Sequence, residues 1–453
     1  MTSVVEEALM ADRKPDISGK RLSKAEYAAN FAGLHPPLDA HAALVESDRC
    51  YFCHDAPCMT ACPTSIDIPM FIRQIQTGHP ANAAKTIFDQ NILGGMCARV
   101  CPTETLCEEV CVRQVAEGKP VKIGMLQRYA TDAAMAEEKH PYARASSTGR
   151  KIAIVGAGPA GLACAHRLAM HGHEVTVFEA RKKSGGLNEF GIASYKTVDD
   201  FAQKEVSFVL AIGGITMEHG KALGKKLKLA GLQANFDAVF LSVGLQGVNA
   251  LGAKNEDAEG IADAVGYIAE LRQAKDLSKL PVGRRVVVIG GGMTAIDVAV
   301  QTKLLGAEDV TILYRRGPAQ MKASVYEQDL AQTRGVKIKH WVAPKKVLVK
   351  NGAATGLRCD YVRQEKGKLV ATGETFDIAA DMIFKAIGQT YADVLGGALE
   401  LEDGRIKADA EGRTSVTGIW AGGDCVAGGK DLTVAAVDDG RRAAESINSF
   451  LKS

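Results

Sequence analysis

The 453-residue chain has no apolar run long enough to cross a bilayer, and its net charge is only +2. The first absence excludes membrane-spanning helices. The second leaves no basic field that would favour nucleic acid or an anionic membrane surface. Residues 1–14 also lack the basic-then-apolar layout of a secretory signal. We therefore expect a cytoplasmic protein whose thiols stay reduced.

Cysteine, in contrast, is concentrated near the N-terminus. The first group is spaced C-x2-C-x4-C-x3-C and is followed by Pro63, and the second is spaced C-x3-C-x5-C-x3-C. A bacterial ferredoxin run is similar, and its fourth cysteine ligates the other cluster. The eight cysteines of the two groups are Cys50, Cys53, Cys58, Cys62, Cys97, Cys101, Cys107 and Cys111. This pattern predicts iron–sulfur ligation.

Two other uses of these cysteines remain open. Zinc is often held by four cysteines in similar pairs, and a disulfide framework is the third possibility. A reducing compartment argues against disulfides, and the nucleotide motifs further along the chain favour iron–sulfur over zinc. The remaining cysteines stand alone and are expected to be small core residues: Cys164, Cys359 and Cys425.

After a polar linker at residues 140–149, apolar strands alternate with helices, which predicts an α/β fold with doubly wound parallel sheets. We expect a helical iron–sulfur domain at residues 1–145, followed by two dinucleotide-binding domains. The second, at 246–388, would be inserted in the first, which is formed by 146–245 and 389–453. Residues 240–245 and 384–389 bracket the insertion and are expected to form paired hinge strands.

The first glycine loop reads Gly156-Ala-Gly158-Pro159-Ala160-Gly161, between a strand at 151–155 and a helix at 159–170. Its glycines suit a tight turn, close approach of a pyrophosphate, and packing of helix on strand. The helix N-terminus supplies N–H donors for the phosphates. Glu179 ends the next strand, at 174–178, where an acid binds a ribose 2′-hydroxyl. We expect FAD in this domain.

Three further segments are expected to contact the flavin. Residues 414–424 read as a strand that ends in Gly-Gly423-Asp424, similar to the second flavin signature of two-dinucleotide flavoproteins, in which the aspartate holds the ribityl chain. A helix predicted at 432–450 would aim its N-terminus, with Thr433 and Val434, at the flavin and stabilise its reduced anion. The loop at Gly186 and Leu187 completes the predicted set.

The second glycine loop follows a strand predicted at 285–289 and opens a helix predicted at 293–305. Its predicted nucleotide-binding residues are Gly290, Gly292, Met293, Thr294 and Ala295. The next strand, at 309–313, is followed by Tyr314 and then by Arg315 and Arg316 rather than by an acid. Arginine accommodates a 2′-phosphate, so the site favours NADPH over NADH, although the pair also fits a solvated strand end.

From about residue 45 onward the chain resembles the electron-input half of dihydropyrimidine dehydrogenase and its separate bacterial subunit, and it is also similar to the glutamate synthase small subunit. The specific stretches are Cys53-His-Asp-Ala-Pro-Cys58, Leu93-Gly-Gly-Met-Cys97, Val100-Cys-Pro-Thr-Glu-Thr-Leu-Cys107 and Ile123-Gly-Met-Leu-Gln127-Arg. The chain departs from the family's Gly-Ile-Pro and Arg-Leu-Pro segments, because it reads Gly191-Ile-Ala-Ser-Tyr-Lys196.

The resemblance implies two [4Fe-4S] clusters with different ligands. The first would be held by Cys50, Cys53, Cys58 and Cys111. The second would be held by Cys62, Cys101, Cys107 and the amide oxygen of Gln127, which leaves Cys97 as a spare thiol. A neutral amide in place of a thiolate removes one negative charge, which should raise the potential of that cluster.

The resemblance also implies a partner, because the family's FMN barrel, where pyrimidine is reduced, is missing from this chain. We expect a hetero-oligomer in which electrons pass from NADPH, or NADH, through FAD and the clusters to an FMN-containing barrel subunit that reduces uracil or thymine. No catalytic acid or base is expected here, since hydride transfer is cofactor chemistry. The alternatives are a glutamate synthase small subunit and a zinc-stabilised nucleotide-binding regulator.

Overall fold

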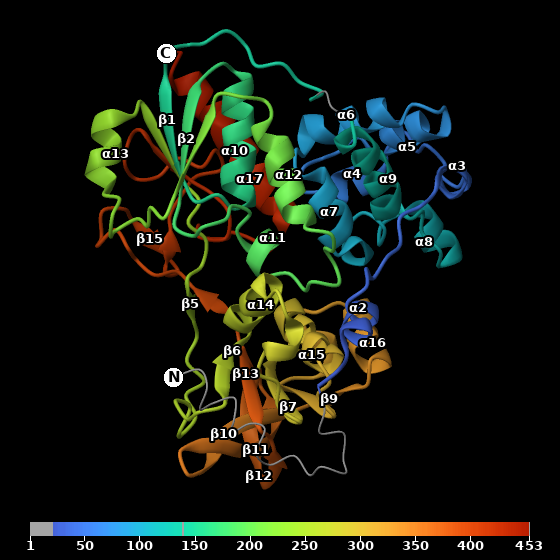
Figure 1. The fold of residues 1–453 in the computed structure, drawn as a ribbon, viewed down its shortest axis with the longest axis vertical. Helices are drawn as coiled ribbons and strands as arrows, with labels where there is room; N and C mark the ends of the chain where they lie inside the picture. Colours follow the sequence, from blue (N-terminus) through green and yellow to red (C-terminus); the bar gives the residue numbers. More distant parts are fainter. Residues whose placement is uncertain (1–20, 138–139, 453) are drawn as a thin grey trace. The chain divides into compact units, whose positions relative to one another are not determined.

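The computed structural model describes residues 21–137 and 140–452, and its chain path is drawn in Figure 1. It divides into two compact units. The smaller unit contains the described residues up to Leu34 together with Phe190–Tyr195 and Val248–Gln389; the larger contains His35–Glu189, Lys196–Gly247 and the chain from Thr390. One sheet domain is therefore inserted in the other, as the sequence predicts. No helix within the described residues is long and apolar enough to cross a membrane.

The larger unit begins with the cysteine-bearing helices. Helix α5 (Ile68–Gln76) shows how they form: Asp67 accepts a hydrogen bond from Met70 N–H at 3.0 Å, and Pro69 lies in the first turn. The apolar face of α5 is buried through Phe71 and Ile75. The other helices of this region are α3 (Ala40–Ser47), α4 (Pro57–Ala61), α6 (Pro80–Gln90), α7 (Gly94–Val100), η1 (Thr103–Thr105), α8 (Val112–Glu117) and α9 (Ile123–Met135).

The same unit holds the first parallel sheet, with strand order β17-β4-β1-β2-β3. These strands are β1 (Lys151–Val155), β2 (Glu174–Glu179), β3 (Ile215–His219), β4 (Ala238–Leu241) and β17 (Ile419–Ala421). Its helices are α10 (Pro159–Met170), α11 (Leu187–Phe190), α12 (Phe201–Leu210), α13 (Leu229–Asn235) and α17 (Thr433–Phe450). Apolar side chains of α10, α12 and α17 join the core of the cysteine-bearing helices, so the two regions share one core.

The smaller unit holds the second parallel sheet, with order β6-β13-β7-β8-β9. Its strands are β6 (Ile261–Asp263), β7 (Arg285–Gly290), β8 (Asp309–Tyr314), β9 (Val336–His340) and β13 (Met382–Ala386). Its helices are α2 (Lys24–Asn30), α14 (Ala264–Gln273), η2 (Leu277–Lys279), α15 (Met293–Leu304), η3 (Pro318–Gln320) and α16 (Val325–Thr333). An antiparallel sheet, absent from the sequence prediction, joins β10 (Val342–Lys350), β11 (Ala353–Glu365) and β12 (Lys368–Ala379).

The prediction that residues 240–245 and 384–389 form paired hinge strands is wrong. Residues 240–245 begin in β4 and 384–389 begin in β13, and these strands lie inside different parallel sheets rather than beside each other. Their apolar runs suit interior strands covered on both faces. The two-stranded pair is instead β5 (Gly247–Val248), shortly after the first segment, with β14 (Gln389–Thr390), which begins at the last residue of the second segment. A further two-stranded pair joins β15 (Leu401–Glu402) and β16 (Arg405–Ile406).

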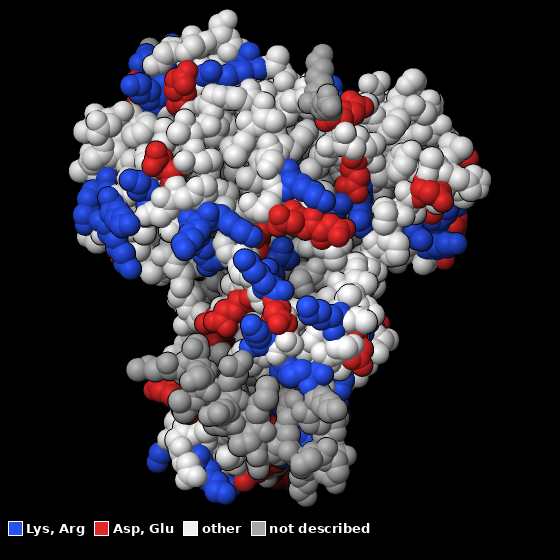
Figure 2. All heavy atoms as spheres, viewed as in Figure 1, with Lys and Arg blue, Asp and Glu red and all other residues white. Residues whose placement is uncertain are grey.

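The predicted domain boundaries at 145–146, 245–246 and 388–389 remain predictions. The first 20 residues of the predicted helical domain lie outside the described residues, and α2 belongs to the smaller unit through its buried Tyr27. The surface carries charges of both signs: on the face drawn in Figure 2, basic and acidic side chains are interspersed. This mixture agrees with a near-neutral chain.

Candidate functional site

The four thiols predicted for the first cluster line one cavity in the larger unit. Cys50 and Cys53 come from the segment between α3 and α4, Cys58 from α4, and Cys111 from the residue before α8. Apolar side chains, including those of Ile68 and Ile72, line the rest of the cavity. Within the described residues, no group of three or more His, Cys, Asp or Glu side chains is placed to hold a single metal ion.

Burial and crowding disfavour the thiolate form of these cysteines. Burial raises the pKa of Cys58 to about 12, and the neighbouring Cys50 and Cys111 act in the same direction. Burial also raises the pKa of Cys50, against a hydrogen bond from Phe52 N–H to its Sγ at 3.4 Å. Thiols that crowd together in an apolar cavity need a cationic core to become thiolate ligands. The donor set and its surroundings therefore fit an iron–sulfur cluster.

The second thiol group is centred on Cys101, which follows α7. A hydrogen bond with Cys97, then burial, then the proximity of Cys107 and Cys62 raise the pKa of Cys101. Burial, then Glu108 and Cys62, raise the pKa of Cys107. The structure thus brings together the three thiols predicted for the second cluster. It also places Cys97, predicted as a spare thiol, beside Cys101 one helical turn away.

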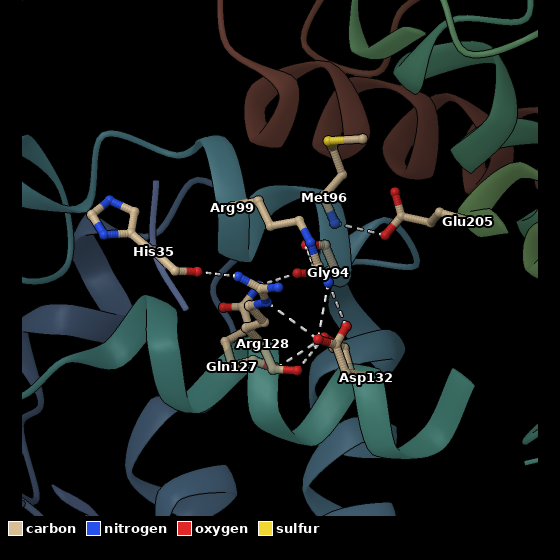
Figure 3. Close-up of polar contacts among 10 residues, drawn as sticks. His35, Gly94, Met96, Arg99, Gln127, Arg128, Asp132 and Glu205 are labelled. Carbon is tan, nitrogen blue, oxygen red and sulfur yellow. Dashed lines mark hydrogen bonds and ion pairs between the residues drawn. The ribbon is translucent and has the colours of Figure 1, made fainter. Parts of the chain in front are cut away.

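Gln127 is buried in α9, although its sequence position gives no hint of a special role. Its Nε2 donates to the Gly94 carbonyl at 2.7 Å, a contact drawn in Figure 3. Because only the amide nitrogen can donate to a carbonyl, this hydrogen bond fixes the orientation of the Gln127 amide, and Oε1 stays available as an acceptor. Gly94 lets α7 approach: a Cβ there would lie 2.5 Å from Ile87 Cγ2 and 3.7 Å from Gln127 Nε2.

The first glycine loop is built so that backbone segments touch. Gly156 has φ +105°, and a Cβ on it would lie 2.2 Å from the Ser242 carbonyl oxygen. A Cβ on Gly161 would lie 1.9 Å from the Gly156 carbonyl oxygen. Ser242, which the sequence analysis missed, donates from Oγ to that same oxygen at 3.0 Å. Gly158 is the N-cap of α10, with Pro159 and buried Ala160 in the first turn.

Glu179, at the end of β2, is buried beneath this loop. Its Oε2 accepts a hydrogen bond from Ala157 N–H at 2.9 Å, and its Oε1 accepts one from Arg181 N–H at 2.8 Å. The carboxylate therefore orders the loop, and its contact with a ribose 2′-hydroxyl remains a prediction. A Cβ on Gly186 would lie 2.7 Å from Gly158 Cα, so the loop that continues into Leu187 lies against the glycine loop.

The C-terminal segment reaches the same region. Gly423 N–H donates to Asp439 Oδ2 at 3.0 Å, and Thr433 Oγ1 donates to Asn188 Oδ1 at 2.7 Å. Burial, followed by the nearby Asp431 charge, raises the pKa of Asp424 to about 6. The predicted strand at 414–424 is shorter than expected, since β17 covers only Ile419–Ala421. Val434 is buried in the first turn of α17, and Asp439 and Asn188 carried no recognisable sequence signal.

The second glycine loop lies in the smaller unit. Gly290 has φ +152°, and a Cβ on it would lie 2.2 Å from the Ala386 carbonyl oxygen. Gly292 caps α15, whose first turn contains Met293, Thr294 and buried Ala295. Arg315 and Arg316 follow β8 and are exposed at its carboxyl end. The two glycine loops therefore lie in different units, and the cysteine groups share a unit with the first loop.

Comparison with protein families covers most of the chain. Residues 150–440 match the family described as pyridine nucleotide-disulphide oxidoreductase. Residues 27–139 match the domain described as "Dihydroprymidine dehydrogenase domain II, 4Fe-4S cluster". The cysteine groups and Gln127 all lie within the match at residues 27–139, and both glycine loops lie within the match at residues 150–440.

Two kinds of curated relative match over nearly their whole length. The chain is 34% identical to the NAD-dependent dihydropyrimidine dehydrogenase subunit PreT of Salmonella typhimurium, over 92% of this chain and 97% of that protein. It is 33% identical to the glutamate synthase [NADPH] small chain of Escherichia coli, over 93% and 94%. These nearly equal identities do not separate the two partner reactions.

Solved structures share the sheet architecture. Thioredoxin reductase of T. acidophilum matches 67% of this chain and all of its own, with a TM-score of 0.54 and 21% identity. Mycobacterium tuberculosis FprA in complex with NADPH matches 67% of this chain and 85% of its own, with a TM-score of 0.56 and 19% identity. At this identity the likeness establishes the fold alone, namely two parallel-sheet dinucleotide-binding domains.

Proposed function

The chain belongs to the pyridine nucleotide-disulphide oxidoreductase family, among the dihydropyrimidine dehydrogenase subunits and glutamate synthase small chains, and we propose that it is the electron-input subunit of a two-chain dihydropyrimidine dehydrogenase. It is an NAD(P)H-dependent flavin and iron–sulfur oxidoreductase subunit. In the proposed reaction it oxidises NAD(P)H and delivers the electrons to an FMN-containing barrel subunit, which reduces uracil or thymine to the 5,6-dihydropyrimidine.

One observation carries this proposal: the predicted ligands gather in the unit that also holds the flavin-type loop. Cys50, Cys53, Cys58 and Cys111 line one cavity. The proximity of Cys62 raises the pKa of both Cys101 and Cys107, and the proximity of Cys107 also raises the pKa of Cys101. Gln127, buried and oriented by Gly94, has an amide oxygen available as the fourth ligand of the second group. We assign one [4Fe-4S] cluster to each group.

The residues proposed to hold FAD surround the first glycine loop. Gly156, Gly158 and Gly161 would let the pyrophosphate approach the N-terminus of α10. The flavin, when bound, supplies the exchange between a hydride pair and single electrons. The protein positions it with the loop at Gly186 and Leu187, with Gly423 and Asp424, and with the first turn of α17, which contains Thr433 and Val434. No side chain of this chain is proposed as a general acid or base.

The second glycine loop is proposed to bind the nicotinamide cofactor. Arg315 and Arg316 would donate hydrogen bonds to the 2′-phosphate of NADPH. A charge-assisted hydrogen bond to phosphate contributes about 1.5–3 kcal/mol. The double substitution R315A/R316A should therefore raise KM for NADPH about 10- to 100-fold, while KM for NADH changes little. Steady-state reduction of an artificial dye by each cofactor checks this. Unchanged KM values for both cofactors would show that the arginines form a solvated strand end.

The partner is tested with the purified pair. We expect the chain, co-expressed with a barrel subunit containing FMN, to oxidise NAD(P)H when uracil or thymine is added. Addition of 2-oxoglutarate with glutamine should have no effect. The reverse result would assign the chain to glutamate synthase, to whose small chain it is similar to nearly the same degree. Iron and sulfide in anaerobically purified protein separate both oxidoreductase functions from a zinc-stabilised regulator, which would contain zinc and no iron.

A further inference from the structure

Helix α12 carries a carboxyl group that the proposed electron transfer leaves unexplained. Glu205 is only 1% exposed, and its Oε1 accepts a hydrogen bond from Met96 N–H at 2.8 Å in the first turn of α7 (Figure 3). Gly95 makes the approach possible, because a Cβ there would lie 3.0 Å from Glu205 Oε1 and 2.7 Å from the Phe201 ring. Burial of a carboxyl group costs free energy, and such groups cluster at functional sites.

The charged groups that face Glu205 come from α7 and α9, and they are engaged with each other. Arg99 of α7 donates to both carboxylate oxygens of Asp132 of α9, at 2.8 and 2.9 Å, and lies over the Phe201 ring. Arg128 of α9 donates to Asp132 as well, at 3.2 Å. Within the described residues, Glu205 belongs to no ion pair. Burial raises its pKa to about 8, against the hydrogen bond from Met96 and the charge of Arg99.

The titratable groups of α10, which also packs against α12, are engaged elsewhere. His166 packs against the His140 ring in a tilted arrangement and against the Tyr142 ring edge-on. Arg167 donates to the Asp89 carbonyl at 2.6 Å, and Cys164 lies in the core of the first sheet. Glu205 is therefore a carboxyl whose charge is set by its burial and by the groups of α7 and α9.

Helix α12 connects the flavin-side loop to the first turn of α7, the helix that is followed by Cys101. Gln203 Nε2 donates to the Ser184 carbonyl at 2.8 Å and to Glu189 Oε2 at 2.9 Å. Residues two apart on a helix point about 200° apart, so Gln203 and Glu205 reach out on opposite sides of α12. On the Glu205 side, Gly95 and Met96 directly follow Gly94, whose carbonyl accepts the hydrogen bond from Gln127.

We propose that Glu205 exchanges a proton in step with the redox state of the second cluster, an inference that rests on the function proposed above. An electron arriving at the cluster adds a negative charge near a buried carboxylate, and a like charge favours the protonated form. Above about pH 8, where Glu205 is ionised while the cluster is oxidised, it would then take one proton from solvent and form one O–H bond, with NAD(P)H as the source of the electron. On oxidation the electron and the proton both leave. By linkage, protonation of Glu205 favours reduction by the same free energy.

The test is the midpoint potential of the second cluster in the anaerobic holoprotein, titrated between pH 6 and 10 and followed by electron paramagnetic resonance. We expect a constant potential below about pH 8, where Glu205 is protonated in both redox states. Above that pH the potential should fall by up to ~59 mV per pH unit, which is a tenfold change in proton activity converted for one electron, until Glu205 is ionised in both redox states. In E205Q the side chain cannot titrate, so the potential should stay near the low-pH value of the wild type.

Controls separate this role from a merely structural one. E205D keeps a carboxyl and should keep a slope, and E137Q, which removes an exposed carboxyl after α9, should match the wild type. The inference is overturned by a wild-type potential that does not change with pH, by an equal slope in E205Q, or by a cluster that accepts no electron. The wild-type measurement decides even if E205Q fails to assemble. Protein without iron, or without a flavin that NAD(P)H bleaches, would instead overturn the proposed function.

Discussion

Replacing Cys101 by alanine is expected to reduce partner-linked pyrimidine reduction by more than about 100-fold, because loss of a metal ligand should exceed the 10- to 100-fold effect of its outer-shell partners. Dye reduction by NAD(P)H should persist, since it requires only the flavin and nicotinamide sites. Comparison of the two assays would therefore show that electron transfer fails between the flavin and the partner subunit. Iron content and electron paramagnetic resonance of the same protein should show the first cluster retained and the second lost.

The matched control is C97A, one helical turn away on α7. Cys97 is buried beside Cys101, so the structure alone would admit it as a fourth thiolate ligand. With Gln127 as that ligand, C97A loses only a small buried side chain and should keep its iron and its partner-linked activity. If C97A loses the second cluster as C101A does, the thiolate rather than the amide completes the site.

The sequence predicted the elements around the two glycine loops well because their signals are local. The predicted helix at 159–170 matches α10 from end to end, and β7 and β8 each extend one residue beyond their predicted ends. A strand, a tight glycine turn and a helix are recognisable without knowledge of the rest of the fold. The antiparallel sheet of the smaller unit was missed because no motif marked its strands.

Other features depend on contacts that sequence separation hides. Glu205 reads as an ordinary helical residue, and only the fold brings it to the backbone of Met96. The hinge prediction was wrong because an apolar run ending in glycine fits an interior parallel strand as well as a connecting strand. Gln127 was singled out by family resemblance, and its buried hydrogen bond to Gly94 supplies a physical reason that the sequence could not.

Replacing Gly161 by alanine is expected to disrupt the first glycine loop, where backbone segments approach each other closely. In G161A the new Cβ would lie 1.9 Å from the Gly156 carbonyl oxygen and 2.7 Å from Ser242 Oγ. Because the first contact is with backbone, β1 and α10 must move apart. We expect a loss of unfolding free energy of about 3 kcal/mol or more. The displaced loop should leave the purified protein without bound flavin and without NAD(P)H-dependent dye reduction.

The same chemical change in α13 is the control for this prediction. A Cβ on Gly231 would meet nothing within 4 Å, and alanine is favoured over glycine inside a helix by about 0.5–1 kcal/mol. G231A should therefore keep its flavin and unfold at an equal or slightly higher denaturant concentration. Flavin absorbance per polypeptide and denaturant titration measure both variants. A flavin-replete G161A would mean that the loop tolerates a wider turn, and the tight contact with Gly156 would then not be required for binding.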